Sequence, residues 1–178
     1  CKKPFPSMPI YFWNDLDNSK YRNAYFDKFN HVWSHGDYIT INKSGGVIIH
    51  GRSDSTLNPG GVRIGTSEIY KIVEKIELIE DSIVAGKVIA GDELIVLFVK
   101  MQGEINNDIK SIINKKLRIH GSPRHIPYKI IQVEDIPYTL NGKKVEIAIK
   151  KIINGEPITN IQSIANPESL DFFEKISI

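Results

Sequence analysis

Apolar residues follow a strand-like or a helix-like spacing over most of the chain from about Gly46 onward. Compact apolar runs predict strands, whereas an apolar residue at every third or fourth position predicts an amphipathic helix. The strands are predicted at residues 47–50, 82–89, 94–101 and 129–133. The helical stripes are Ile69, Ile72, Val73 and Ile76, then Ile109, Ile112, Ile113 and Leu117, and finally Val145, Ala148, Ile149 and Ile152.

Predicted helices and strands alternate along the chain, and this order favours an α+β fold in which helices pack on a small mixed β-sheet. The first helix is expected to have Thr66 or Ser67 as its N-cap. Residues 1–35 are different, because they are rich in aromatic residues, asparagine and proline and show little periodicity. We expect four aromatic rings in this part to lack packing partners: Tyr11, Phe12, Trp13 and Trp33.

The composition is that of a chain able to bury a hydrophobic core. With 178 residues, of which 41% are hydrophobic, one domain or slightly more is expected. A net charge of +2 is too small to indicate a nucleic acid or a membrane as partner. The longest apolar runs, such as residues 94–99, are too short to span a bilayer. The first residues lack the apolar core of a signal peptide. The composition agrees with that of a cytoplasmic protein, and this location is expected.

Cysteine and histidine usage bears on metal binding. The single cysteine excludes an internal disulfide bond and a cysteine metal cluster. The five histidines show no ligand spacing. The sequence therefore predicts no metal site.

Three segments carry candidate chemistry, and the most informative is the turn Asn141-Gly142-Lys143. Asn-Gly is a strong signal for a two-residue hairpin turn, in which both central positions take positive φ. A rigid turn of this kind would hold the amine of Lys143 at a fixed place, where it could contact a phosphate or a carboxylate. A lysine beside a surface turn can also be a solubilising charge, and the tripeptide alone does not separate the two interpretations.

The second segment is a glycine-rich loop between residues 50 and 69. Three glycines would let its backbone approach a ligand closely: Gly60, Gly61 and Gly65. Two arginines offer planar donor groups for phosphate or sugar oxygens: Arg52 and Arg63. The loop is not a Walker loop, because Thr66 stands where that motif requires lysine.

The third segment is Trp33-Ser-His-Gly-Asp37, which precedes an apolar strand. A carboxylate beside a glycine can accept hydrogen bonds from the two hydroxyls of a ribose. An aspartate in a turn can equally bond to its own backbone, and Asp37 alone does not decide between these roles.

Together and in this order, the three segments resemble the last three core motifs of the adenylate-forming enzymes, the superfamily of acyl-CoA synthetases, luciferases and peptide-synthetase adenylation domains. Further segments resemble one branch of that family, which acts on acetoacetate: Lys3-Pro-Phe-Pro-Ser-Met-Pro, Phe12-Trp-Asn-Asp, Thr56-Leu-Asn-Pro-Gly-Gly-Val-Arg-Ile-Gly-Thr, Ser122-Pro-Arg-His-Ile-Pro and Asn166-Pro-Glu-Ser-Leu. The resemblance covers nearly the whole chain. Such enzymes are several times longer, so it implies the C-terminal portion of one, with the N-terminal domain of the same polypeptide as a partner.

The family's architecture implies a domain boundary near the glycine-rich loop. Residues 1–53 would be the β-rich end of a large N-terminal domain, and residues 54–178 a mobile C-terminal domain that turns about Asp54. A hinge needs a residue that absorbs a large φ/ψ change, and a polar residue between a strand end and a proline-glycine loop suits that. An aspartate that caps a turn would look the same in the sequence.

The resemblance also implies a two-step reaction. A carboxylate first attacks the α-phosphate of ATP to give an acyl-adenylate and pyrophosphate, and the thiol of coenzyme A then displaces AMP. Lys143 matches the catalytic lysine of the first step, where it would offset the repulsion between two anions. Magnesium (Mg2+) would accompany ATP, with its ligands mostly outside this chain.

The other matched positions contact the nucleotides. Asp37 matches the acceptor for the ribose hydroxyls, Arg52 a second nucleotide contact, and Arg63 an arginine near the phosphates. Gly61 matches a glycine on the path of the pantetheine thiol. Arg118 sits where related enzymes have an arginine near the coenzyme A nucleotide.

Three positions depart from the general pattern of the family. Ser55 stands where many relatives have a second aspartate, Asn58 where lysine is frequent, and Glu146 where many have arginine. These departures fit the acetoacetate branch, but they leave auxiliary charge roles open at the three positions. Glu68 is expected to orient the glycine-rich loop, although an acid in the first turn of a helix is also explained by the helix dipole.

Two other functions stay open. The acid could be another short one, such as acetate or propionate, because the acyl pocket would lie outside this chain. The chain could also be a non-catalytic binding module with the same fold. Lys143, Arg52 and Asp37 together speak against that, since a site without catalysis has no need for all three.

Overall fold

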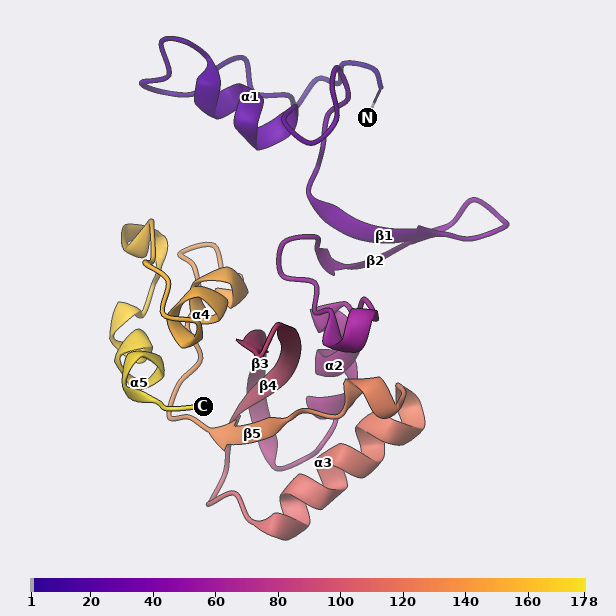
Figure 1. Cartoon of the computed structure of the whole chain (residues 1–178), viewed down its shortest axis with the longest axis vertical. Coiled ribbons are helices and arrows are strands. Elements are labelled where there is room, and N and C mark those ends of the chain that lie inside the picture. Colours follow the sequence, from indigo (N-terminus) through magenta and orange to yellow (C-terminus); the bar gives the residue numbers. More distant parts are fainter. Residues whose placement is uncertain (1) are drawn as a thin grey trace. The chain divides into compact units, whose positions relative to one another are not determined.

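The structure is a computed structural model that describes residues 2–178 and divides into two compact units, Cys1–Asp37 and Tyr38–Ile178 (Figure 1). Among the described residues, no helix is both long and apolar enough to cross a membrane. Each unit has its own packed residues.

The first unit is organised around Trp33. Its side chain is only 6% exposed and stacks on Tyr25, with ring centroids 3.7 Å apart. Tyr25 ends the short helix α1 (Ser19–Tyr25), and the N–H of Ser34 donates to the Tyr25 carbonyl, so the chain turns back and brings Trp33 onto the helix end. The expectation that Trp33 and Phe12 lack packing partners is therefore wrong, since the Phe12 ring also meets the Tyr25 ring edge-on. Trp13 is 88% exposed as expected.

The second unit contains a two-stranded sheet, a three-stranded sheet and most of the helices (Figure 1). The two-stranded sheet pairs β1 (Asp37–Ile41), which begins at the last residue of the first unit, with β2 (Val47–Arg52). The elements that follow are η1 (Pro59–Gly61), α2 (Thr66–Val73), β3 (Ile79–Ile89), β4 (Asp92–Met101), α3 (Asn107–His120), η2 (Pro123–His125), β5 (Lys129–Gln132), α4 (Glu146–Ile153), η3 (Ile161–Ser163), η4 (Pro167–Ser169) and α5 (Leu170–Lys175).

β4 is the central strand of the three-stranded sheet. It pairs antiparallel with β3, where Ile83 lies opposite Phe98, and parallel with β5, where Leu97 lies opposite Ile130. The prediction of a small mixed sheet is confirmed. Successive residues of a strand point to opposite faces, so Leu97 belongs to one apolar cluster and Phe98 to the other.

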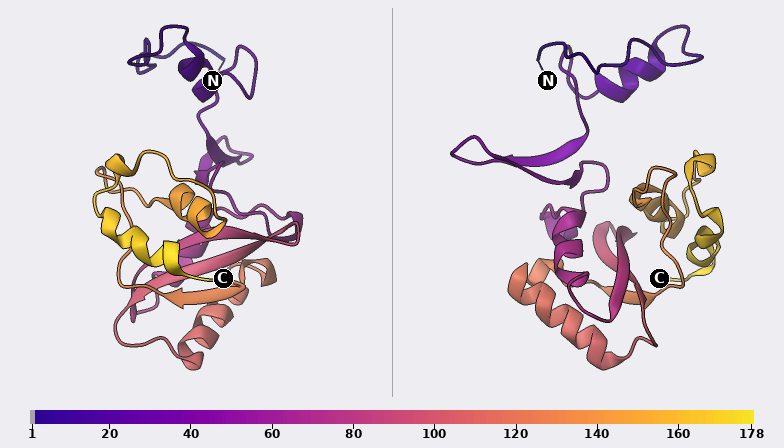
Figure 2. Two further views of the ribbon diagram at one scale, coloured as in Figure 1. Left: turned by 60° about the vertical axis from the view of Figure 1, so that its left-hand side comes forward. Right: turned by 180° about the vertical axis from the view of Figure 1, so that it is seen from behind.

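Helices cover both faces of this sheet. α2 and α3 contribute Ile69 and Leu117 to the cluster on one face, and α4 and α5 contribute Ile149 and Phe173 to the cluster on the other. Figure 2 shows α2 and α3 on one side of the strands and α4 and α5 on the opposite side. The predicted α+β fold is confirmed, with its core divided into two layers by the sheet.

The inward face of α3 is narrower than its apolar pattern predicts. Ile109, Ile113 and Leu117 are buried at intervals of four residues. Ile112 is 45% exposed, so the inward orientation predicted for it is wrong. A helix on the surface of a small domain needs only one line of apolar residues against its neighbours, and Ile112 lies beside that line.

Candidate functional site

The segment around Asn141 forms the predicted hairpin, but with a different turn. Thr139 N–H donates to the carbonyl of Lys143 at 2.8 Å, and Gly142 N–H donates to the carbonyl of Thr139 at 2.8 Å. Of the two turn residues, Gly142 has a positive φ of 71° and Asn141 does not. The loop therefore has three residues and ends in a glycine bulge. Thr139 pairs with Lys143 across the hairpin, and three residues lie between them. The prediction of a two-residue turn with positive φ at both positions is therefore wrong.

Lys143 lies directly after this bulge and is exposed. Its backbone N–H donates to the Thr139 hydroxyl at 3.1 Å, which adds a side-chain contact to the backbone pairing at the same point. Leu140, at the other side of the tip, is 71% exposed. The hairpin thus presents an amine on an exposed tip whose backbone is held by local hydrogen bonds.

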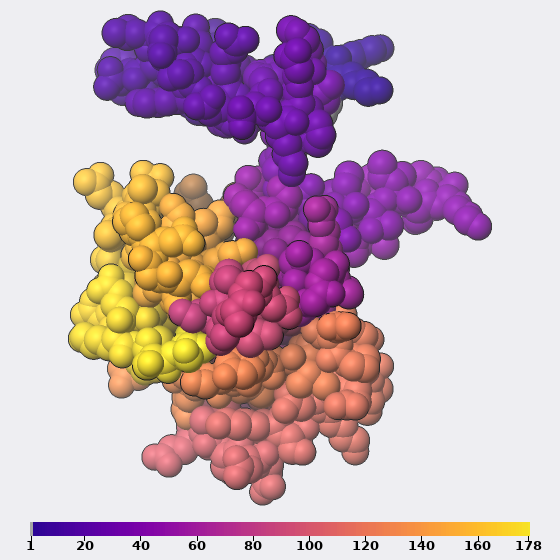
Figure 3. Space-filling model, viewed as in Figure 1, coloured from indigo at the N-terminus to yellow at the C-terminus, as the bar shows by residue number. Residues whose placement is uncertain are grey.

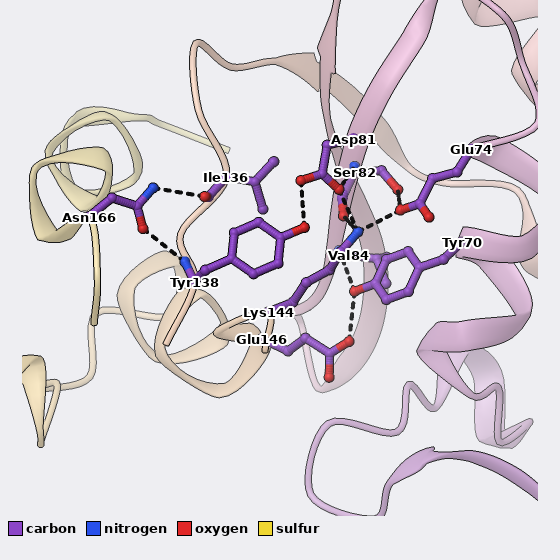
Figure 4. A network of polar contacts seen from close by, with 10 residues as sticks. All are labelled: Tyr70, Glu74, Asp81, Ser82, Val84, Ile136, Tyr138, Lys144, Glu146 and Asn166. Carbon is purple, nitrogen blue, oxygen red and sulfur yellow. Dashed lines mark hydrogen bonds and ion pairs between the residues drawn. The ribbon is translucent and has the colours of Figure 1, made fainter. Parts of the chain in front are cut away.

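The next residue, Lys144, is enclosed by the domain (Figure 4). Its Nζ lies 2.5 Å from Oε1 of Glu74 on α2 and 2.6 Å from Oδ1 of Asp81 on β3. The same ammonium donates to the backbone carbonyl of Ser82. The side chain of Lys144 is only 18% exposed, so two adjacent lysines occupy opposite environments.

Two tyrosine hydroxyls complete this network (Figure 4). Tyr138 donates to Oδ2 of Asp81 at 2.6 Å, and Tyr70 donates to Oε1 of Glu146 at 2.7 Å. The Tyr70 oxygen also accepts from the backbone N–H of Val84. The Nζ of Lys144 lies 4.3 Å from the centre of the Tyr70 ring, a distance at which the ring face attracts a cation.

The glycine-rich loop is closed at its base and held at its tip. Leu57 and Ile64 pair across the base through two backbone hydrogen bonds of 2.9 Å, and both side chains are buried. At the tip, the N–H of Gly60 donates to Oδ1 of Asp92 at 3.1 Å. Asp92 lies at the turn between β3 and β4, which reaches the surface (Figure 3). Gly61 has φ of 81° and open space where a side chain would lie, so the loop can present bare backbone to a ligand.

Glu68 ties the end of this loop to its surroundings. Its Oε1 accepts from the N–H of Gly65 at 2.8 Å, and its two oxygens lie 3.4 Å from Nδ1 of His50 and 3.6 Å from Nε2 of His125. The expectation that Glu68 orients the loop is consistent with these contacts. The expectation that Thr66 or Ser67 is the N-cap is wrong, because Gly65 takes that position. A Cβ on Gly65 would come 2.4 Å from the carbonyl oxygen of His50, which excludes the usual capping residues.

The remaining predicted site residues lie in separate places. Nε of Arg52 is 3.7 Å from Oδ1 of Asp54, so the end of β2 and the predicted hinge residue are joined by an ion pair. Asp37 belongs to the first unit, and its Oδ2 lies 3.5 Å from Nε2 of His35. Two further predicted residues are exposed cations of the second unit: Arg63 in the glycine-rich loop and Arg118 on α3. Among the described residues, no three histidine, cysteine, aspartate or glutamate side chains are grouped so that they could hold a metal ion.

The chain is similar over almost its whole length to several acetoacetyl-CoA synthetases. It is 54% identical over 178 residues to the enzyme of Caenorhabditis elegans, and this alignment covers 97% of this chain and 25% of the relative. It is 49% identical over 175 residues to the enzyme of Rhizobium meliloti (strain 1021), and this alignment covers 97% of this chain and 27% of the relative. The solved structure of the Streptomyces lividans acetoacetyl-CoA synthetase matches with a TM-score of 0.90 at 41% identity, over 98% of this chain and 27% of that one. No protein-family profile matches the chain.

Over nearly its whole length, the chain is homologous to acetoacetyl-CoA synthetases, which are adenylate-forming enzymes. The family resemblance of its motifs is thereby confirmed, including the branch. The chain spans about a quarter of the length of the acetoacetyl-CoA synthetases that it matches, at 25% and 27% of the two relatives named above.

In this acetoacetyl-CoA synthetase homologue, the sequence left Glu146 without a role, and it did not single out Lys144. The structure gives both a contact: Glu146 accepts from Tyr70, and Lys144 is bound by Glu74 and Asp81. Lys144 could have been noticed as the second of two adjacent lysines after a turn. Its partners lie 63 and 70 residues away in the sequence, which no local pattern reveals.

The same network shifts the pKa of two tyrosines. Burial, and then the hydrogen bond to Asp81, raises the pKa of the Tyr138 hydroxyl. Burial, and then the negative charge of Glu146, raises the pKa of the Tyr70 hydroxyl well above its ordinary value. Both environments favour the neutral hydroxyl, because a tyrosinate would face a carboxylate at hydrogen-bond distance.

These shifts predict a loss of stability at alkaline pH. Above the ordinary tyrosine pKa of about 10, the unfolded chain releases the two protons that the folded chain retains, so the free energy of unfolding falls as the pH rises. The fall is about 1.4 kcal/mol per pH unit for each hydroxyl that stays fully neutral. Urea unfolding measured at several pH values from about 8 to about 11 should show it. The double variant Tyr70→Phe/Tyr138→Phe should have a shallower slope with pH, and an unchanged slope would contradict the assignment.

Proposed function

We propose that this chain is the C-terminal part of an ATP-dependent acid–thiol ligase that converts acetoacetate, ATP and coenzyme A into acetoacetyl-CoA, AMP and pyrophosphate. The observation that carries the proposal is the similarity of 97% of the chain to acetoacetyl-CoA synthetases at 49% and 54% identity. The exposed amine of Lys143 on a held hairpin supports the same function.

In the first step, an oxygen of the acetoacetate carboxylate attacks the α-phosphorus of ATP. The bond from that phosphorus to the oxygen bridging the β-phosphate breaks, and pyrophosphate leaves. Two anions must approach each other, so a cation that touches both lowers the barrier and fixes their relative orientation. Lys143 is the residue we assign to this role, because the hairpin presents its ammonium outward.

In the second step, the sulfur of coenzyme A attacks the acyl carbon, the bond to the AMP oxygen breaks, and the thiol proton is lost. Gly61 would line the path of the thiol, since its position has open space beside it. Arg118 would contact the coenzyme A nucleotide. Mg2+ would accompany ATP, bound mainly by the phosphates and by groups outside this chain.

The nucleotide contacts in this proposal are Asp37, Arg52 and Arg63. The carboxylate of Asp37 would accept from the ribose hydroxyls, and the guanidinium groups of the two arginines would donate to ribose or phosphate oxygens. Exposed arginine side chains with planar donor groups support these roles, because each can reorient toward a bound anion.

Residues 1–53 would end the large N-terminal domain, and residues 54–178 would form the mobile C-terminal domain. Contacts near the boundary support Asp54 as the pivot. The hydroxyls of Ser55 and Thr56 both donate to the carbonyl of Arg52, and the Arg52 side chain pairs with Asp54. Polar contacts of this kind can be exchanged for water when a domain turns, at little cost compared with breaking apolar packing.

The test is thioester synthesis by the complete polypeptide that carries this chain. With ATP, magnesium and coenzyme A, acetoacetate should be the best acid, ahead of acetate and propionate. A preference for acetate or propionate would replace the proposal by a synthetase for another short acid. Failure with every acid, together with binding of a nucleotide or protein partner, would favour the non-catalytic module. The isolated 178-residue chain should form no thioester, because the acyl and adenine pockets lie outside it.

Proline at the pivot should separate the two half-reactions. Asp54→Pro fixes φ and removes the backbone N–H, so the complete ligase should be held in one domain orientation. One half-reaction should then slow by tenfold or more, while the other keeps its rate within about twofold, by analogy with other lid and domain motions. Rapid-quench measurement of each half-reaction decides this. Asp54→Ala is the control, because it removes the same side chain without fixing φ. Normal rates for both steps in Asp54→Pro would exclude Asp54 as the pivot.

A further inference from the structure

We propose that Lys144 is a positioning residue for adenylation, because its bonds to Glu74 and Asp81 fix where the neighbouring Lys143 presents its amine. The inference rests on the proposed function, since it concerns the lysine that adenylation would use. Lys144 itself would not touch the substrates, because its ammonium is enclosed by the domain.

Both arms of the hairpin are attached to one carboxylate. Tyr138 and Lys144 form a bridge pair across the hairpin. Tyr138 donates to Oδ2 of Asp81 at 2.6 Å, and Lys144 donates to Oδ1 of the same group at 2.6 Å. Figure 4 shows the two side chains reaching Asp81 from the two arms. A rotation or shift of the hairpin would therefore break a charge-assisted bond at one arm or the other.

The arm that carries Lys143 depends on side chains more than the other arm does. On the first arm, the N–H of Leu140 donates to the carbonyl of Ser163 at 2.9 Å, and the N–H of Tyr138 donates to the Asn166 side chain. These bonds fix the backbone of that arm to the segment before α5. The second arm reaches α2 and β3 through the side chain of Lys144, and Glu146, at the start of α4 directly after the arm, accepts from Tyr70 on α2.

Apolar packing of the hairpin is limited to Tyr138 and Val145, which are partly buried against one apolar cluster of the domain. None of residues 138–147 is fully buried, although the flanking residues Pro137 and Ala148 are. A segment without a fully buried residue depends strongly on its hydrogen bonds and ion pairs for its order. Loss of the Lys144 ammonium should thus loosen the hairpin while the two apolar clusters of the domain stay intact.

The orientation of Lys143 follows from that of Lys144. Adjacent side chains of an extended arm point to opposite sides, so a Lys144 side chain held inward directs Lys143 outward. Glu74 and Asp81 would repel each other without the ammonium between them, and the arm would lose its anchor. Arginine is a poor substitute, because its planar guanidinium cannot reproduce three bonds from one compact ammonium.

Hydrogen exchange of the 178-residue chain measures the anchoring without reference to activity. Lys144→Met should raise the exchange rate of the hairpin amides by tenfold or more, in particular the bonded amides of Thr139, Gly142 and Val145. Lys87→Met is the matched control, because Lys87 is also a partly buried lysine that donates to a carbonyl, at the far end of α4. That variant should leave hairpin exchange unchanged.

The second measurement uses the complete ligase and separates the two half-reactions. Lys144→Met should lower acetoacetate-dependent pyrophosphate exchange by about tenfold or more, since a displacement of about 1 Å can cost on the order of a hundredfold in rate. Thioester formation from preformed acetoacetyl-adenylate should keep its rate. A variant that merely folds poorly would lower both activities by the same factor.

A second variant keeps the proposal testable if Lys144→Met does not fold. Asp81→Asn retains the shape of the shared anchor and removes its charge, so it should change exchange and adenylation in the same direction. The double variant should be little worse than either single one, because both remove the same bond.

Two results would overturn the proposal: slower adenylation with unchanged hairpin exchange, or faster hairpin exchange with normal adenylation. If Lys143→Ala adenylates normally, the proposed role of Lys143 fails. The exchange measurement then still decides whether Lys144 anchors the hairpin.

Discussion

Lys143→Ala in the complete ligase should lower the rate of adenylation by on the order of a hundredfold or more. The loss corresponds to about 3 kcal/mol, the usual cost of removing one preorganised electrostatic donor from a reaction that develops negative charge. The reason is structural: the exposed amine follows a glycine bulge whose backbone is fixed by two hydrogen bonds of 2.8 Å, from the Thr139 N–H to the Lys143 carbonyl and from the Gly142 N–H to the Thr139 carbonyl. Acetoacetate-dependent exchange of labelled pyrophosphate into ATP measures the effect.

The control concerns the second step and a second lysine. Lys143→Ala should still convert supplied acetoacetyl-adenylate and coenzyme A into product at nearly the normal rate, because the thiol attack involves a neutral acyl carbon and a different part of the domain. Lys115→Ala, at an exposed position on α3, should change neither step. If Lys143→Ala slows both steps equally, or neither, Lys143 does not have the proposed role.

The sequence predicts the layers of this fold well, because the buried residues recur with the spacing of a strand or a helix. The runs at 82–89 and 94–101 lie in β3 and β4, and the stripes that contain Ile69 and Ile149 lie in α2 and α4 except for one terminal residue of each. Side chains buried against a sheet must recur with the spacing of their element, so a single sequence records them. Ile112 departs from this rule because periodicity marks the apolar residues of a helix but not the width of the face that is covered.

The local geometry of the site is less accessible from the sequence. Asn-Gly correctly marks the hairpin, but the turn type depends on which residues pair across it, and that is set by bonds such as Thr139 to Lys143. The N-cap of α2 is a glycine, Gly65, because the His50 carbonyl leaves no room for a Cβ at this position. The two residues are 15 positions apart in the chain, so no local pattern reveals the contact. Lys144 is a stronger example, since its ligands come from α2 and β3.

The two lysines also show why residue type alone is a weak guide to a site. Lys143 and Lys144 have the same side chain and adjacent positions, yet one is exposed and the other has two carboxylates within 2.6 Å. A lysine so enclosed offers no free donor to a substrate. The motif therefore identifies the turn, and the partners of each lysine decide which of them can act on a ligand.

Gly61→Leu should have the opposite effect to Lys143→Ala. It should lower thioester formation from preformed adenylate by on the order of a hundredfold, a typical cost of a displaced reactant, and leave adenylation nearly intact. A leucine side chain at Gly61 would extend into the open space beside the loop, where the thiol of coenzyme A would approach. The loop itself should keep its place, because Leu57 and Ile64 close its base and Asp92 accepts from the N–H of Gly60.

Backbone strain must be separated from this steric block, because Gly61 has φ of 81°. Any other L-residue there costs about 1–2 kcal/mol of stability. Gly61→Ala carries the strain with almost no bulk, so it should lose stability but keep most of the thioester activity. Gly45→Leu carries the same strain and bulk at a turn with φ of 83°, and it should change neither half-reaction. If Gly61→Ala is as inactive as Gly61→Leu, the loop acts through its backbone conformation, and Gly61 does not line the path of the thiol.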